Sequence, residues 1–318
     1  MPSDPTSVTT IDCHYLQPEH AAAYLIIEQG RAAFVDNNTV HAIPLLLKAL
    51  DDHGLRPADV AYIIPTHLHL DHGGGTSALA KECPNAAVLA HPRAVRHLID
   101  PSRLIQGVKT VYGEAEFNRL YAPISPIDAA RVRGVEDGET LRFGDRVLTF
   151  MHTPGHANDH ICIHDSRSNG VFTGDTFGVE YNATRPTKRP FLMCSSAPTD
   201  FDPEAARASL RRIVGTGADR VFMAHYGELT AVREGAEVML ESIGRMEAIL
   251  KDATASGLTG AELVRSCERR IRAAVDEQIA ACGTIMEEAG WRTLETGIRI
   301  DAQGIAYIAE KSRIGCHG

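Results

Sequence analysis

The feature that most restricts the fold is the segment "IIPTHLHLDHGGG", residues 63–75, which holds three histidines and an aspartate within six positions. It follows the apolar run "ADVAYIIPT", which is typical of a buried strand. His67 and His69 are two residues apart, so they point the same way in an extended segment, and Asp71 continues this period before His72. Burying so many ionisable groups without a cation is costly. The segment therefore predicts a metal site, in preference to a loop of hydrogen-bonded polar residues.

Composition excludes several classes of protein. The 318 residues, 44% of them hydrophobic, suit one large domain or a domain with an extension. The N-terminus has no basic start or apolar segment, and no window approaches a membrane span of roughly 18 apolar residues, so we expect a cytoplasmic protein without a membrane partner. The seven cysteines are scattered, which indicates neither a disulfide framework nor a thiolate zinc site. A net charge of -9 disfavours nucleic acid as a partner.

The order of elements predicts an α/β sandwich. Strand-like runs such as "AAYLIIE" and "AAFVD" alternate with helical stretches in the first half, and short strands broken by turns follow from Val135. Asp202 and Pro203 are typical of an N-cap and a first helical position. Residues 93–128 form a helical or irregular insert that suits a lid. We expect a catalytic domain over residues 1–230 and a helical extension over residues 231–318.

Three further candidate ligands stand where later strands end. His156 follows "FMHTPG", Asp175 follows Gly174 at the end of "VFTG", and His225 follows "RVFMA". Each residue alone is more often a structural one with satisfied hydrogen bonds. Together they repeat the arrangement of the first segment, in which a polar residue directly follows an apolar strand.

These motifs resemble those of the metallo-β-lactamase superfamily, and most closely its glyoxalase II-like branch. The resemblance covers the H-x-H-x-D-H segment, the T-P-G-H turn, the G-D pair and the late histidine, from Thr9 to about Thr230. It implies an αβ/βα sandwich of two mixed sheets flanked by helices, with two metal ions at one edge of the sheets. It also implies the ligand sets. The first metal is held by His67, His69 and His156, the second by Asp71, His72 and His225, and Asp175 bridges them.

The ligand chemistry agrees with this interpretation. Five imidazoles and two carboxylates suit two divalent ions, with zinc preferred and iron or manganese accepted. Two such ions favour hydrolysis with a metal-bridging hydroxide as nucleophile, and Asp71 would orient it or carry a proton. His160 is a candidate for supporting a ligand by a hydrogen bond. The alternative for His160 is a packed strand residue.

We expect a small-molecule substrate, an ester, thioester or lactone. Phe177, Tyr181, Arg185 and Tyr226 are candidates for its pocket, and the nearby basic residues suit a carboxylate or phosphate, although a solvated loop would look the same. Two alternatives remain open: a phosphodiesterase or nuclease of the same superfamily, and a non-catalytic regulatory or binding protein that contains metal.

The helical extension carries more apolar surface than isolated helices can expose. This surface must pack on the sandwich, on a second chain as a homodimer, or on both. The extension and the insert over residues 93–128 either wall the substrate pocket or form a cap without a catalytic role. The stripe comprises Val238, Leu240, Ile243, Met246, Ile249 and Leu250.

Overall fold

The computed structural model describes residues 8–180, 184–185, 188–196, 200–286 and 288–315. Its contacts divide the chain into two compact units. The first unit comprises Met1–His152, Asp159–Gly174 and Arg220–Glu228. The second comprises Thr153–Asn158, Asp175–Asp219 and Leu229–Gly318. The domain boundary expected after residue 230 stays a prediction.

The first sheet of the first unit has six strands in chain order. Strands β1 to β3 pair antiparallel, and β3 to β6 pair parallel. Because β3 and β4 are parallel, their carboxyl ends lie at the same edge, where the polar segment after residue 64 begins. The strands are β1 Val8–Asp12, β2 Ala22–Glu28, β3 Arg31–Val35, β4 Val60–Ile64, β5 Ala87–Ala90 and β6 Val132–Gly134.

Helices cover one face of this sheet. Leu46 and Leu50 of α1 belong to one buried cluster with Phe34 and Ile63 of the strands. The predicted insert is helical: it forms α4, α5 and α6, and Phe117 and Tyr121 pack on Leu70 of α2. The helices are α1 Ile43–Asp52, α2 Leu70–Gly73, α3 Thr76–Glu82, α4 Pro92–Ile99, α5 Ser102–Tyr112 and α6 Glu114–Leu120. Short 3-10 turns span Val40–Ala42, Pro57–Asp59 and Ala129–Arg131.

The second sheet has the order β13-β12-β10-β9-β8-β7 and is also mixed, since β10 and β12 are parallel while its other assigned pairs are antiparallel. Its inner face meets the first sheet in a second buried cluster, where Tyr24 and Ile64 pack with Phe150 and Phe172. Two mixed sheets flanked by helices confirm the predicted α/β sandwich. The strands are β7 Thr140–Phe143, β8 Arg146–His152, β9 Ile161–Asp165, β10 Gly170–Gly174, β12 Arg220–Met223 and β13 Gly227–Leu229.

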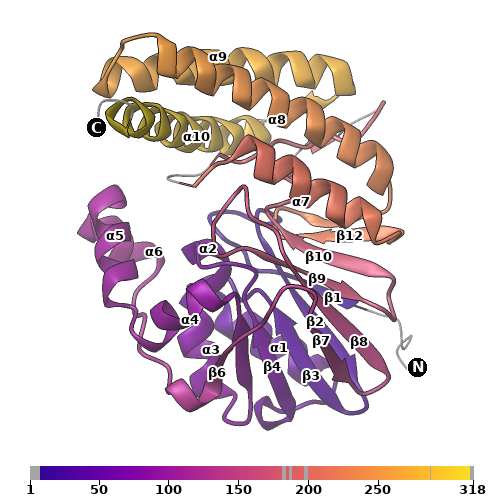
Figure 1. The fold of residues 1–318 in the computed structure, drawn as a ribbon. Coiled ribbons are helices and arrows are strands. Elements are labelled where there is room, and N and C mark those ends of the chain that lie inside the picture. The colour runs from indigo at the N-terminus through magenta and orange to yellow at the C-terminus, as the bar shows by residue number, and fades with distance from the viewer. Residues whose placement is uncertain (1–7, 181–183, 186–187, 197–199, 287, 316–318) are drawn as a thin grey trace. The chain divides into compact units, whose positions relative to one another are not determined.

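The second unit is mainly helical. Asp202 caps α7, Pro203–Gly215, by accepting hydrogen bonds from two backbone N–H groups, as the sequence predicted. Helices α8 Val232–Ala255, α9 Gly260–Cys282 and α10 Glu288–Gly315 pack against one another (Figure 1). A strand pair that the sequence did not predict joins β11, Thr184–Arg185, to β14, Ile285–Met286. The C-terminal helices themselves are confirmed.

Most of the apolar stripe on α8 is buried within the chain. Val238, Ile243, Met246 and Ile249 are buried, whereas Leu240 is 36% exposed. The stripe is therefore covered largely without a second chain, and the homodimer stays a prediction.

Among the described residues, no helix combines the length and the hydropathy that a membrane span requires. The six cysteines described are all buried free thiols.

Candidate metal centre

The segment after β4 brings its histidines together by a loop and a short helix. The rings of His67 and His69 have centroids 4.5 Å apart, and Nε2 of His67 lies 3.0 Å from Nδ1 of His69. The extended period does not continue to Asp71, which corrects the sequence-based expectation, because α2 begins at Leu70. The carbonyl of His72 accepts hydrogen bonds from two backbone N–H groups that follow β3, which holds this helical turn against the sheet.

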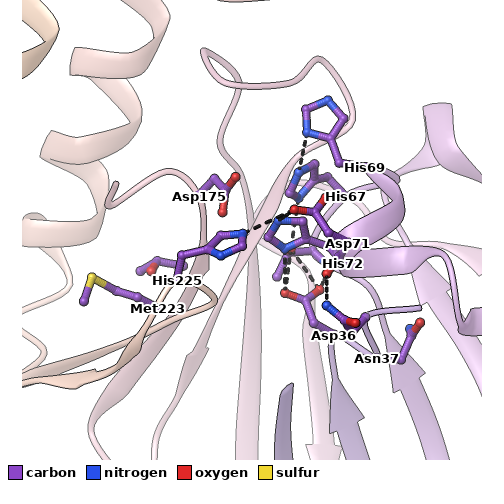
Figure 2. A network of polar contacts seen from close by, with 12 residues as sticks. Asp36, Asn37, His67, His69, Asp71, His72, Asp175, Met223 and His225 are labelled. Atoms are coloured by element: carbon purple, nitrogen blue, oxygen red, sulfur yellow. Dashed lines mark hydrogen bonds and ion pairs between the residues drawn. The ribbon is translucent and has the colours of Figure 1, made fainter. Parts of the chain in front are cut away.

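Asp71, His72 and His225 form a compact group in the first unit, with one ligand atom of each lying within 4.8 Å of the others. Nε2 of His225 is 3.4 Å from Oδ2 of Asp71, and Nε2 of His72 is 3.9 Å from the same oxygen. Both imidazoles are buried, whereas the side chain of Asp71 is 28% exposed. Figure 2 shows His225 directed at Asp71, and His72 held from behind by Asp36.

Hydrogen bonds to Nδ1, the ring nitrogen that faces away from Asp71, orient both imidazoles. Nδ1 of His72 lies 3.3 Å from Oδ2 of Asp36, and Nδ1 of His225 lies 2.6 Å from the carbonyl oxygen of His20. A carboxylate and a carbonyl only accept, so Nδ1 of each ring carries a proton, and in the neutral tautomer Nε2 presents a lone pair toward Asp71. That lone pair and the carboxylate of Asp71 are both acceptors. A cation between them resolves this repulsion, so the group fits a divalent metal ion.

Asp36 is a candidate supporting residue that the sequence analysis did not single out. Besides His72, it accepts hydrogen bonds from the backbone N–H of Thr66 at 2.7 Å and from the hydroxyl of Thr66 at 2.9 Å. It is buried and stands directly after β3. The run "AAFVD" showed the same signal as the other candidates, a polar residue directly after an apolar strand. Asp36 thus ties the loop after β4 to the histidine on α2.

We expect Asp36→Asn to weaken metal binding by about 10- to 100-fold. The reason is that a neutral amide replaces the charged carboxylate that accepts the hydrogen bond from the imidazole of His72. A competition titration against a chelator measures the change. Asp12→Asn is the matched control, since Asp12 also ends a strand and accepts two backbone hydrogen bonds, at 2.9 Å each. Equal affinities for the Asp36 variant and the wild type would contradict this role.

The second unit carries two of the predicted ligands, His156 and Asp175. Nε2 of His156 lies 3.3 Å from Oδ2 of Asp175, and both side chains are buried. Nδ1 of His156 donates to the carbonyl oxygen of Ser195 at 3.2 Å. The pattern of the first unit is repeated: a backbone carbonyl accepts the hydrogen bond from Nδ1, and a carboxylate faces Nε2.

His160 packs directly on the metal-binding segment. Its ring stacks on that of His67 with centroids 4.8 Å apart, and it is buried. Gly174 lies so close that a Cβ there would stand 2.5 Å from Nε2 of His160, and its φ of +47° also favours glycine. Asp159 accepts a hydrogen bond from the backbone N–H of Leu68 at 3.2 Å. The Asp159–His160 pair thereby supports the loop that carries His67.

The candidates for the substrate pocket lie in different surroundings. Phe177 is fully buried. Tyr226 is partly buried against the cluster between the two sheets, and burial raises the pKa of its hydroxyl to about 12. Tyr181 and the side chain of Arg185 lie outside the described residues. Arg189, one of the nearby basic residues, makes two hydrogen bonds to Glu241, at 2.8 and 2.6 Å.

Comparisons with known proteins identify relatives of this chain. The family model for the metallo-beta-lactamase superfamily matches residues 17–225. A probable hydroxyacylglutathione hydrolase of Schizosaccharomyces pombe is 33% identical over 159 residues, 48% of this chain and 48% of that protein. An acyl-coenzyme A thioesterase of Homo sapiens is 30% identical over 138 residues, 40% of this chain and 44% of that protein. The chain spans about half the length of these curated relatives.

Solved structures show the same fold over nearly the whole chain. An archaeal metallo-beta-lactamase superfamily protein from Sulfolobus tokodaii aligns with a TM-score of 0.65 at 20% identity, covering 94% of this chain and 98% of that one. A metallo-beta-lactamase family protein from Thermus thermophilus aligns with a TM-score of 0.63 at 19% identity, covering 97% and 94%. With the family model matching most of its length, the chain belongs to the metallo-beta-lactamase superfamily.

Proposed function

We propose that this protein is a metal-dependent hydrolase of a small ester, thioester or lactone, with thioesters the first class to test. The observation that carries the proposal is the group of Asp71, His72 and His225, in which each imidazole is oriented from behind and presents Nε2 to a carboxylate. The names of the two curated relatives, a probable hydroxyacylglutathione hydrolase and an acyl-coenzyme A thioesterase, support thioesters as substrates.

We assign the ligands from the order of the family motifs in the sequence. Two divalent ions, zinc by preference and iron or manganese as alternatives, would supply a polarising charge for the substrate carbonyl and hydroxide near neutral pH. Asp71 has the most exposed side chain of its group, so it suits the orientation of water as well as a ligand role. His67, His69 and His156 hold the first ion, Asp71, His72 and His225 hold the second, and Asp175 bridges them.

We expect the chain to bind close to two metal ions, because seven ligands exceed what one tetrahedral or octahedral ion needs. Elemental analysis after metal loading and removal of excess metal measures the ratio. The variant His225→Ala, which removes a ligand of one set, should lower it toward one ion per chain. Saturation of the wild type at a single ion would contradict the dinuclear assignment.

A hydrolysis screen with the metal-loaded protein tests the substrate class. It compares acyl-glutathione and acyl-coenzyme A thioesters, aryl esters, lactones, phosphodiesters and RNA at equal concentrations. The proposal expects the highest kcat/KM on an acyl compound and loss of that activity after chelation. Turnover confined to phosphodiesters or RNA would contradict the acyl substrate class, and a fully metal-loaded protein without turnover would indicate a binding role instead.

A further inference from the structure

A segment of the second unit, residues 188–196, is hydrogen-bonded along its length to the C-terminal helices α8, α9 and α10. On the helices, the partners are both backbone and side-chain groups. From α9, Cys282 accepts a hydrogen bond from Lys188 N at 3.1 Å and donates through Sγ to Pro190 O at 3.2 Å, and Gln278 Nε2 donates to Leu192 O. From α8, Glu241 binds Arg189, and the Ser242 hydroxyl accepts from Cys194 N at 2.9 Å.

The last of these hydrogen bonds are made to α10. The backbone N–H of Ser196 donates to Oδ1 of Asp301 at 2.7 Å, and the hydroxyl of Ser196 lies 3.3 Å from the same oxygen. Asp301 is only 5% exposed, and burial raises the pKa of its carboxyl to about 7. A carboxyl group is costly to bury unless hydrogen bonds compensate it, so Asp301 is bound at this position through the N–H and hydroxyl of Ser196, together with a side-chain hydrogen bond from Ser195.

The same segment contacts both loops that carry predicted metal ligands in this unit. The carbonyl oxygen of Ser195 accepts the hydrogen bond from Nδ1 of His156. Met193 and Val179 exchange two backbone hydrogen bonds, of 3.0 and 2.9 Å. The turn that starts at Asp175 closes by a hydrogen bond of 3.0 Å from Gly178 N to the carbonyl of Asp175. Residues 193–195 therefore lie between the C-terminal helices and the two ligand loops.

From these contacts we infer that Asp301 and Ser242 are positioning residues for the metal centre. By fixing residues 194–196 they fix the carbonyl of Ser195, which sets the ring orientation and proton position of His156. The helical extension would thus determine the affinity for one metal ion as well as stability. This inference rests on the proposed function, because it requires that His156 binds a metal ion.

The central experiment compares two substitutions of Asp301. Asp301→Leu removes the acceptor for Ser196 N and should weaken binding of one metal ion by about 10- to 100-fold, the usual effect of losing a group that supports a ligand. The ion held by Asp71, His72 and His225, which all belong to the first unit, should keep its affinity. Asp301→Asn retains an acceptor oxygen and should restore near wild-type affinity at both positions.

Two measurements separate this effect from a loss of folding. Chelator competition yields the two metal dissociation constants, and the absorption spectrum of the Co²⁺-loaded protein reports the ligand geometry of each ion. The spectrum of Asp301→Leu should change for one ion only, while circular dichroism stays that of the wild type. If Asp301→Leu does not fold, Ser242→Ala provides the test, with Ser312→Ala of α10 as control, because the Ser312 hydroxyl bonds within its own helix, at 2.8 Å to Ile308 O.

The outcomes distinguish the role of Asp301 and Ser242 from the proposed function. One weakened ion in Asp301→Leu or Ser242→Ala, with Asp301→Asn and Ser312→Ala near wild type, supports the inference. A wild type that binds two ions and variants with unchanged constants and spectra would overturn it and leave the proposed function standing. Equal weakening of both ions would also overturn it, since that result indicates general destabilisation. A wild type that binds no metal would instead refute the proposed function.

Discussion

Asp175→Asn should lower hydrolytic turnover by orders of magnitude while the protein remains folded. Asp175 is the proposed bridging ligand, and a neutral amide is a poor bridge between two cations and would raise the pKa of the water that they activate. The change keeps the size and shape of the side chain, so the buried surroundings of Asp175 should tolerate it. The measurement is kcat on the best substrate from the screen, together with metal content.

The matched control is Asp51→Asn on the exposed face of α1, which should leave both kcat and metal content unchanged. Circular dichroism of the two variants shows whether a loss of activity reflects a loss of folding. Near wild-type turnover with two bound ions in Asp175→Asn would show that Asp175 is not the bridge.

Arg146→Leu should destabilise the protein by about 3–5 kcal/mol, because it removes the cation that pairs with two buried carboxylates, and Arg167 approaches one of them, Glu28, only at 3.8 Å. Arg146 of β8 is fully buried, donates to Glu28 at the end of β2 at 3.0 Å, and donates to Asp165 at the end of β9 at 2.5 Å. Asp165 and Glu28 are also buried. The guanidinium therefore links the two sheets of the sandwich through two charges that have little access to water.

Urea denaturation measures this effect as a lower midpoint with an unchanged slope. Arg142→Leu on the neighbouring strand β7 is the control, since Arg142 is exposed and its replacement should change stability by less than about 0.5 kcal/mol. Similar midpoints for Arg146→Leu and Arg142→Leu would show that the buried ion pairs contribute no more than a surface arginine.

Local patterns explain which elements the sequence predicted correctly. The buried strands, the helix capped by Asp202 and the long amphipathic helices depend on side-chain period and capping, which act over a few residues. The error at Asp71 has a local cause too. The extended period fails after His69 because α2 begins at Leu70, and backbone N–H groups that follow β3 hold its turn. Strand β14 is two residues long and depends on its partner β11, so no periodic signal marked it.

The sequence by itself determined the superfamily, the α/β sandwich and the identity of the candidate ligands, because these depend on residue types at short spacings and on their order along the chain. Only the tertiary structure decided what supports those ligands. Asp36 and His72 are 36 residues apart, and Ser196 and Asp301 are 105 residues apart. Hydrogen bonds of this range arise only when the sheets and helices have packed, so no local pattern distinguishes Asp301 from the other acidic residues of its helix.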